Sequence, residues 1–185
     1  MPVIGPDPTG TIVNGSSDSD VIDSGGGNDA VHAYEGDDTV YGGANRDHLY
    51  GEDGNDFLDG EGENDKLYGG AGDDTLVGGG QNDRLYGGDG DDIINGGDDD
   101  DVLFGDNPSD GNDNEGGHDI FLFDGDDGND KVFDFEHGID KVHLLGDDLS
   151  YTLDYTNSGN TVMTWGATTV TFYDEKLDAS DILVV

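Results

Sequence analysis

The sequence predicts an all-β protein, a right-handed parallel β-roll solenoid of nine-residue repeats with a C-terminal β cap. Three features of the sequence lead to this expectation. A nonapeptide recurs ten times without insertion or deletion from Gly15 to Phe104. Its sixth position is always aspartate and its eighth always aliphatic. From Ser150 onward, alternating polar and apolar stretches separated by Asn, Ser and Gly indicate a β-meander.

The overall composition, taken without the repeat, would suggest a disordered chain. Among 185 residues there are 45 acidic and 6 basic side chains, which give a formal net charge of −39, and 34 glycines. Such a chain has little apolar surface to offset its self-repulsion. The fixed period overturns that interpretation, because a low-complexity tract is biased in composition but not in order. A collagen-like interpretation fails too, since the collagen glycine period is three.

The charge and the missing residue types exclude several classes of function. Nucleic acid recognition needs a basic footprint, so we expect no nucleic acid partner, and anionic membranes are disfavoured for the same reason. Without cysteine there can be no disulfide, thiolate zinc site or cysteine nucleophile. No apolar run is long enough to span a bilayer, so no membrane insertion is expected. The first ten residues lack the basic and apolar regions of a cleaved secretory signal, so we expect either retention or another export route.

Each repeat consists of a glycine-rich turn and a short strand. The first six positions can adopt the left-handed angles of a tight turn, and the last three form a strand with position eight facing inward. Two nonapeptides then make one coil, so residues 18 apart stack about 4.8 Å from each other. The expected core is Ile22, Val40, Leu58, Leu76 and Ile94 facing Val31, Leu49, Leu67, Leu85 and Leu103.

The same stacking aligns the position-six aspartates in two rows, one on each edge of the roll. Carboxylates about 5 Å apart repel by about 3 kcal/mol at an effective dielectric constant of 20, so the roll should not close without a cation. Carboxylate and carbonyl oxygens suit Ca²⁺ better than Mg²⁺ or soft metals. The alternative is that the aspartates only start turns and solubilise the surface. The first row is Asp20, Asp38, Asp56, Asp74 and Asp92, and the second is Asp29, Asp47, Asp65, Asp83 and Asp101.

Position four distinguishes the two edges. On the first edge it is glycine, at Gly36, Gly54, Gly72 and Gly90. On the second edge it is Asn45, Glu63, Gln81 and Asp99. Because Glu and Gln adopt left-handed angles poorly, we expect calcium binding at the first edge and leave the occupancy of the second edge open.

The columns spell GGxGxDxUx, and on these residues the sequence resembles the RTX (repeat-in-toxin) family of calcium-binding β-rolls. The resemblance implies that each Ca²⁺ lies between two stacked loops, held by the position-six aspartates and backbone carbonyls of both. It implies roughly eight ions, and folding on Ca²⁺ binding outside the cell. Beyond the two rows, the candidate metal residues are Asp110, Asp119 and Asp130, with Gly36, Gly54, Gly72 and Gly90 at the turns.

We divide the chain into four segments. Residues 1–14 are an N-terminal half-coil or leader, 15–104 the β-roll, 105–149 degenerate repeats with a closing segment, and 150–185 the β cap. In the third segment, Pro108 and Asn112 interrupt the pattern at turn and core positions and indicate a loop or distorted half-coil. The pattern returns around Asp119, Asp130 and Asp140. In the cap, Trp165, Phe172 and Tyr173 are expected in the core.

The chain ends with Asp181 followed by four aliphatic residues. This resembles the uncleaved terminal signal of type I secretion substrates, and a final cap strand is the alternative interpretation. The expected partner is the type I secretion machinery, and the expected location is the exterior or cell surface of a Gram-negative bacterium.

One sheet is expected to carry two outward-facing columns of basic or imidazole and of aromatic side chains. His48, Lys66 and Arg84 form one, beside an aromatic column of Tyr50, Tyr68, Tyr86 and Phe104. Three interpretations remain open: the rings and stems shield the sheet, they dock the C-terminal segment or a partner chain, or they bind an anionic polysaccharide.

No HExxH, GxSxG or phosphate-loop motif occurs, so we expect no catalytic activity. The sequence favours a calcium-folded extracellular structural or binding module, which could self-associate through its N-terminal end. The alternative is a C-terminal module of a secreted enzyme such as a serralysin-like protease or an alginate epimerase.

Overall fold

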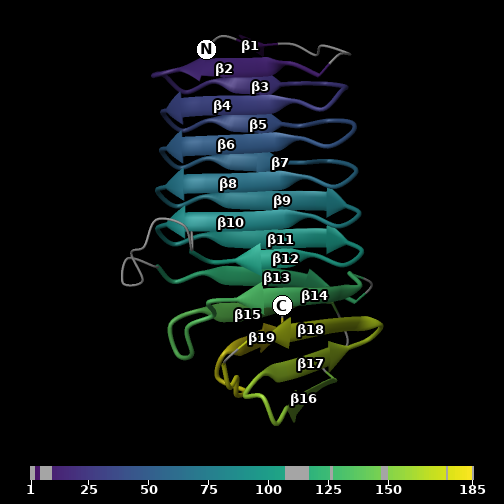
Figure 1. Ribbon diagram of the computed structural model, residues 1–185. Helices are drawn as coiled ribbons and strands as arrows, with labels where there is room; N and C mark the ends of the chain where they lie inside the picture. The colour runs from purple at the N-terminus through teal and green to yellow at the C-terminus, as the bar shows by residue number, and fades with distance from the viewer. Residues whose placement is uncertain are drawn as a thin grey trace.

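The structure is a computed structural model that describes residues 3–4, 10–106, 117–125, 127–146, 150–173 and 175–184. Within these ranges the chain forms strands and turns but no helix, and therefore no helix that could cross a membrane. Two sheets face each other, and their coils stack along one axis from the N-terminus to a cap formed by the last strands (Figure 1). The predicted all-β parallel solenoid is confirmed.

The first sheet contains nine strands, all parallel. Its strands lie in sequence order, because each coil adds one strand to the growing edge. They are β1 (Val3–Ile4), β3 (Val21–Asp23), β5 (Thr39–Tyr41), β7 (Phe57–Asp59), β9 (Thr75–Gly80), β11 (Ile93–Asp98), β13 (Ile120–Asp124), β15 (Lys141–Leu145) and β19 (Ile182–Val184).

The second sheet contains ten strands. Its parallel part is β2 (Ile12–Ser16), β4 (Ala30–Glu35), β6 (His48–Asp53), β8 (Lys66–Ala71), β10 (Arg84–Asp89), β12 (Val102–Phe104) and β14 (Asn129–Phe133). The cap then follows with β18 (Thr168–Phe172), β17 (Thr161–Trp165) and β16 (Tyr151–Tyr155). Strand β18 pairs parallel with β14, whereas β17 and β16 continue antiparallel, as the meander pattern predicts.

The strand register confirms the 18-residue coil. Leu49 pairs with Leu67 and Leu67 with Leu85, while Ile22 pairs with Val40 in the opposite sheet. The position-eight side chains are completely buried from Ile22 to Leu103. The core between the two sheets therefore consists of one inward aliphatic residue per strand along the repeats.

The period changes where the repeats become degenerate. The spacing between stacked core residues grows from 18 to 27 at the pair Ile94 and Phe121, and to 29 at Leu103 and Val132. The nonapeptide 105–113 is therefore an insertion into the coil period. Its residues Pro108, Asp110 and Asn112 lie outside the described part of the chain.

Larger aromatic side chains close the C-terminal end of the core. Phe121 and Phe135 are buried with ring centroids 5.9 Å apart, and Phe172 meets Phe135 edge-on at 5.3 Å. Trp165 is buried as expected. The prediction for Tyr173 is wrong, because its ring stacks on Phe133 at 4.4 Å in an outward, half-buried column. Tyr173 follows the buried Phe172 directly, so its side chain points to the opposite, outward face of the sheet. Its aromatic character alone had suggested a core position.

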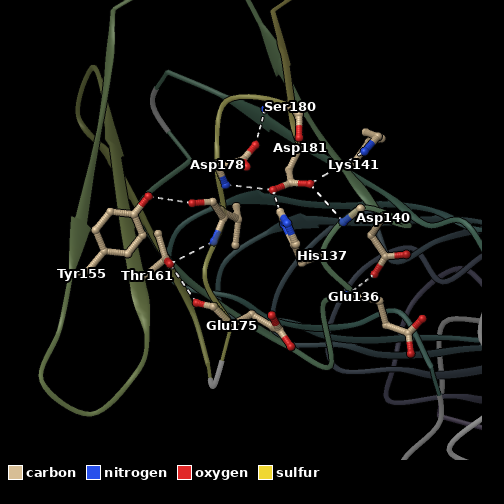
Figure 2. Close-up of polar contacts among 12 residues, drawn as sticks. Glu136, His137, Asp140, Lys141, Tyr155, Thr161, Glu175, Asp178, Ser180 and Asp181 are labelled. Carbon is tan, nitrogen blue, oxygen red and sulfur yellow. Dashed lines mark hydrogen bonds and ion pairs between the residues drawn. The ribbon is translucent and has the colours of Figure 1, made fainter.

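The last strand is anchored by one buried aspartate, Asp181 (Figure 2). The Nδ1 atom of His137 and the backbone N–H of Asp178 each lie 2.8 Å from Asp181 Oδ2. The N–H of Gly138 donates to Oδ1 at 3.1 Å, and Lys141 Nζ lies 3.8 Å from it. This network ties β19 to the turn before β15.

We expect truncation of one core side chain to destabilise the roll strongly. Leu67→Ala should cost about 2–5 kcal/mol, because the close-packed coil cannot fill the cavity that it leaves. Urea denaturation in excess Ca²⁺ measures the effect. The control is Ile93→Ala, since Ile93 points outward and is 36 % exposed. An equal loss of unfolding free energy in both variants would contradict a core built from the position-eight side chains.

Candidate calcium sites

Two continuous ladders of aspartates run along the edges of the roll. On the first edge, the N–H of Asp38 donates to Asp56 Oδ1 at 2.7 Å, and that of Asp74 to Asp92 Oδ1 at 2.8 Å. On the second edge, the N–H of Asp65 donates to Asp83 Oδ1 at 2.7 Å. Each carboxylate thus reaches back to the preceding coil and holds its turn.

The second carboxylate oxygen has no such partner. In each of the ten repeat aspartates, one buried oxygen accepts no hydrogen bond from the described residues. For example, Asp74 and Asp92 are 1 % and 0 % exposed, and their Oδ2 atoms are unpaired. Burying an unpaired carboxylate oxygen is costly unless the group is neutralised by a proton or a cation.

A backbone carbonyl shares the space around each unpaired oxygen. A Cβ atom built on Gly60 would lie 2.5 Å from Asp65 Oδ2 and 2.6 Å from the carbonyl oxygen of Gly78, one coil further on. The same arrangement recurs at Gly69, beside Asp74 Oδ2 and the Gly87 carbonyl. Glycine at position one therefore leaves this oxygen-lined space open, whereas Ser24 and Ala33, which occupy position one in two early repeats, place a buried side chain there.

The donor set is made entirely of oxygen. In the part of the chain that the structure describes, no three His, Asp or Glu side chains converge on one point. A cation at the ladder would therefore take ligands from stacked aspartates together with backbone carbonyls. Such an irregular oxygen set fits Ca²⁺, which accepts six to eight oxygen ligands with flexible geometry.

Burial raises the pKa values of the ladder aspartates in the inner coils, from Asp47 to Asp101. Desolvation raises the pKa of Asp83 to about 8 and that of Asp92 to about 9. Hydrogen bonds from the preceding coil lower these pKa values, and the charges of neighbouring aspartates raise them again. Without a cation, Asp83 and Asp92 therefore hold their protons at neutral pH.

The turns on the two edges differ at position four. On the first edge Gly36, Gly54, Gly72 and Gly90 have φ between 119° and 140°, a range that strongly favours glycine. On the second edge Asn45, Glu63, Gln81 and Asp99 have φ between 75° and 81°. These residues occupy the left-handed helical region, so the second edge uses a different turn that a side chain can adopt at a cost of about 1–2 kcal/mol.

The structure places almost all of the predicted residues in the ladders. The ten repeat aspartates lie as expected, and Asp119 and Asp130 extend the first and second ladders by accepting the N–H groups of Asp92 and Asp101 at 3.0 and 2.9 Å. Asp110 lies outside the described residues.

Sequence reasoning missed two participants at the C-terminal end. Asp140 Oδ1 accepts the N–H of Asp119 at 3.0 Å, a role that its position-six register would have indicated. Asp134 accepts the N–H of Gly105 at 2.9 Å and keeps an unpaired buried Oδ2. It occupies no position-six register, so no pattern could have identified it.

An additional, exposed row of hydrogen bonds made by the side chains at position five was also not predicted from the sequence. On the first edge, the N–H of Asp73 donates to Asn55 Oδ1 at 3.2 Å, and that of Asp91 to Asp73 Oδ1 at 3.1 Å. These exposed side chains also accept backbone N–H groups, but in the opposite direction: each accepts from the following coil, whereas each buried aspartate accepts from the preceding one. The preference for Asn and Asp at this position is the signal that could have revealed it.

A stack of coils with two internal rows of aspartates defines a calcium-binding repeat solenoid. Four copies of the RTX calcium-binding nonapeptide repeat match residues 14–49, 32–67, 50–85 and 77–107, about half of the chain. The chain therefore belongs to the RTX calcium-binding nonapeptide repeat family.

Two solved structures are similar in fold. The extracellular lipase LipA from Serratia marcescens is 20 % identical, with a TM-score of 0.41 over 98 % of this chain and 40 % of the lipase. The AlgE6R3 subunit of the Azotobacter vinelandii mannuronan C5-epimerase is 20 % identical, with a TM-score of 0.29 over 95 % of this chain and 78 % of that one. The chain thus spans less than half the length of the lipase. A search of curated proteins finds no match.

We expect Gly72→Ala to weaken the first edge. Gly72 has φ 126°, and a Cβ there would collide with the Gly54 carbonyl of the preceding coil, so the substitution should cost about 1–3 kcal/mol or more. A calcium titration followed by circular dichroism should shift to higher Ca²⁺ concentration. Gly80→Ala is the matched control, because a Cβ on Gly80 meets nothing within 4 Å. Identical titrations for the two variants would show that the turn tolerates a side chain.

The calcium-free roll should be more stable in acid than at alkaline pH. Aspartates of an unfolded chain titrate near 3.9, whereas the pKa values of Asp83 and Asp92 in the roll are about 8 and about 9. The raised pKa values contribute stability below about pH 4, and this contribution is lost as the pH rises through the folded values. In EDTA, circular dichroism should show more β structure at about pH 5 than at about pH 9. The same β signal at both values, with light scattering excluding aggregation, would contradict proton uptake by the ladders.

Proposed function

We propose that this chain is a calcium-dependent folding module, with Ca²⁺ bound along both aspartate ladders. The observation that carries the proposal is the unpaired, buried carboxylate oxygen in each of the ten repeat aspartates. Stacked aspartates and the turn carbonyls beside them would hold the ions. The ion would neutralise the carboxylates and would also coordinate the oxygen of each that has no hydrogen-bond donor.

The first edge is proposed to bind Ca²⁺ more tightly than the second. Its position-four glycines adopt angles that side chains avoid, so these turns are free of local strain. Glu63 and Gln81 on the second edge hold left-handed angles, and part of the binding energy there offsets this cost. The roughly eight ions of the sequence analysis would therefore fall into two affinity classes.

The calcium affinity would couple folding to the location of the chain. If each site has a dissociation constant of about 0.1–1 mM, as extracellular calcium modules do, 10 mM Ca²⁺ contributes roughly 1.4–2.7 kcal/mol per ion. In a submicromolar cytosol these sites stay empty, and the chain remains expanded. We therefore propose export by type I secretion from a Gram-negative bacterium and folding outside the cell, where the roll acts as a structural or binding module.

A direct test compares Asp74→Asn with Asp73→Asn. Asp74 is buried in the ladder with an unpaired oxygen, whereas Asp73 is an exposed neighbour, so both variants remove one carboxylate charge. We expect Asp74→Asn to reduce the number of bound ions and raise the Ca²⁺ concentration at the folding midpoint, measured by ion counting and circular dichroism. Asp73→Asn should leave both nearly unchanged. A β spectrum in wild-type protein that EDTA does not alter at neutral pH would falsify coupled folding.

A further inference from the structure

The roll carries a cationic groove on its second edge. A groove of about 1000 Å³ runs across the coils between the position-five and position-seven side chains of the second sheet. Arg46, Lys66, Arg84 and Lys131 line it. These are four of the six basic residues in a chain of net charge −39, so positive charge is concentrated in one place.

The four groove cations form no ion pair with acidic side chains of the described residues. Although the chain has 45 acidic residues, no ion pair within 4.0 Å joins any of the four to an acidic group among the described residues. Three of them, Arg46, Arg84 and Lys131, are exposed and Lys66 is half-buried. They remain available to an external anion.

The carboxylates beside the groove are mostly turned away from it. Asp29, Asp65 and Asp83 are 4 %, 2 % and 3 % exposed, because their side chains point into the ladder. Asp100 is the exposed acidic residue of the lining, and it accepts hydrogen bonds from the backbone and side-chain N–H groups of Asn129 at 3.0 Å each. When the ladder is neutralised, the groove is therefore a positive strip on an otherwise acidic molecule.

Three of the groove cations lie in one column of the second sheet. Lys66 and Arg84 pair in register on neighbouring strands, with His48 one strand before them, and Lys131 is in register with Val102, which follows Arg84. Neighbouring side chains in this column are therefore one strand spacing apart, about 4.8 Å. A ligand that matches this column is linear and carries several anionic groups along its length.

The aromatic column beside the groove offers sugars no ring face. Consecutive rings from His32 through Tyr50, Tyr68 and Tyr86 to Phe104 stack on each other at 4.7–4.9 Å, with planes within 14° of parallel. Each inner face is covered by the next ring, so the column shields the sheet. The C-terminal segment does not cover the column either, since Tyr173 continues it at its end. On this side of the roll, a sugar ligand would therefore contact the groove rather than the ring faces.

We propose that the groove binds an anionic polysaccharide with one acidic group per sugar, lying across the coils. Carboxylates of such a chain would meet Arg46, Lys66, Arg84 and Lys131, and its hydroxyl groups would meet the exposed Asn64 and Asn82 of the lining. A nucleic acid is disfavoured because its denser charge would be repelled by the acidic surroundings. The inference rests on the proposed function in one respect: the ladders must be filled for the groove to form.

The test uses the calcium-loaded chain of residues 1–185 and a labelled oligogalacturonate long enough to span the groove, with binding followed by fluorescence anisotropy. We expect binding that weakens as NaCl is raised, because ionic contacts release counterions. Lys66→Gln combined with Arg84→Gln should weaken binding at least tenfold. Lys176→Gln, at an exposed lysine outside the groove, should have no such effect. A neutral oligosaccharide of the same length should not bind.

Three outcomes would overturn the proposal: no binding by wild-type protein, wild-type binding by the double variant, or equally tight binding of an oligothymidylate of the same charge. Circular dichroism and ion counting accompany every titration. If the double variant fails to fold, Arg46→Gln with Lys131→Gln takes its place and carries the same expectation. A wild-type protein that stays unfolded in Ca²⁺ would contradict the proposed function instead, so the two failures are distinguishable.

Discussion

A buried carboxylate oxygen without a hydrogen-bond donor is the constraint on which the whole roll depends. It recurs in every repeat aspartate, and the core between the sheets is only one aliphatic side chain deep per strand along the repeats. So thin a core cannot offset rows of desolvated acids by itself. The turn carbonyl beside the oxygen and the in-register stacking bring further oxygen atoms to the place where we propose that a cation binds.

The nine-residue period was sufficient to predict the coil, the core and the position of both aspartate ladders. Leu67 and Asp74, for instance, lie in their expected registers, because one inward position per strand leaves little choice once the period is known. The rest depended on tertiary contacts that no period encodes. Asp134 joins a ladder out of register, and Asp181 finds His137, which lies 44 residues away in the sequence. Glu63 and Gln81 show the opposite case, where the fold imposes angles that their local preference disfavours.

The two edges of the roll divide the chemistry between them. The first edge has position-four glycines and no Lys or Arg in its turns. No basic side chain of these turns can therefore neutralise its aspartates, and we propose that a cation from solution does so. The second edge combines strained turns with the groove cations, which leave the buried aspartates unpaired and face outward. The same nonapeptide thus places buried, unpaired carboxylate oxygens on both edges, and basic side chains beside the second edge alone.

The reach of each aspartate also gives the stack a direction. The carboxylate of Asp92 extends back to the N–H of Asp74, so a finished coil offers a ready acceptor to the coil before it in sequence. The aromatic residues Phe121, Phe135 and Phe172 close the carboxyl-terminal end of the core, whereas Ile12 is exposed on the first described strand of the second sheet. The buried backbone N–H of each ladder aspartate thus depends on the coil that follows it, and the carboxyl-terminal segment supplies the last acceptors, as Asp140 does for the N–H of Asp119.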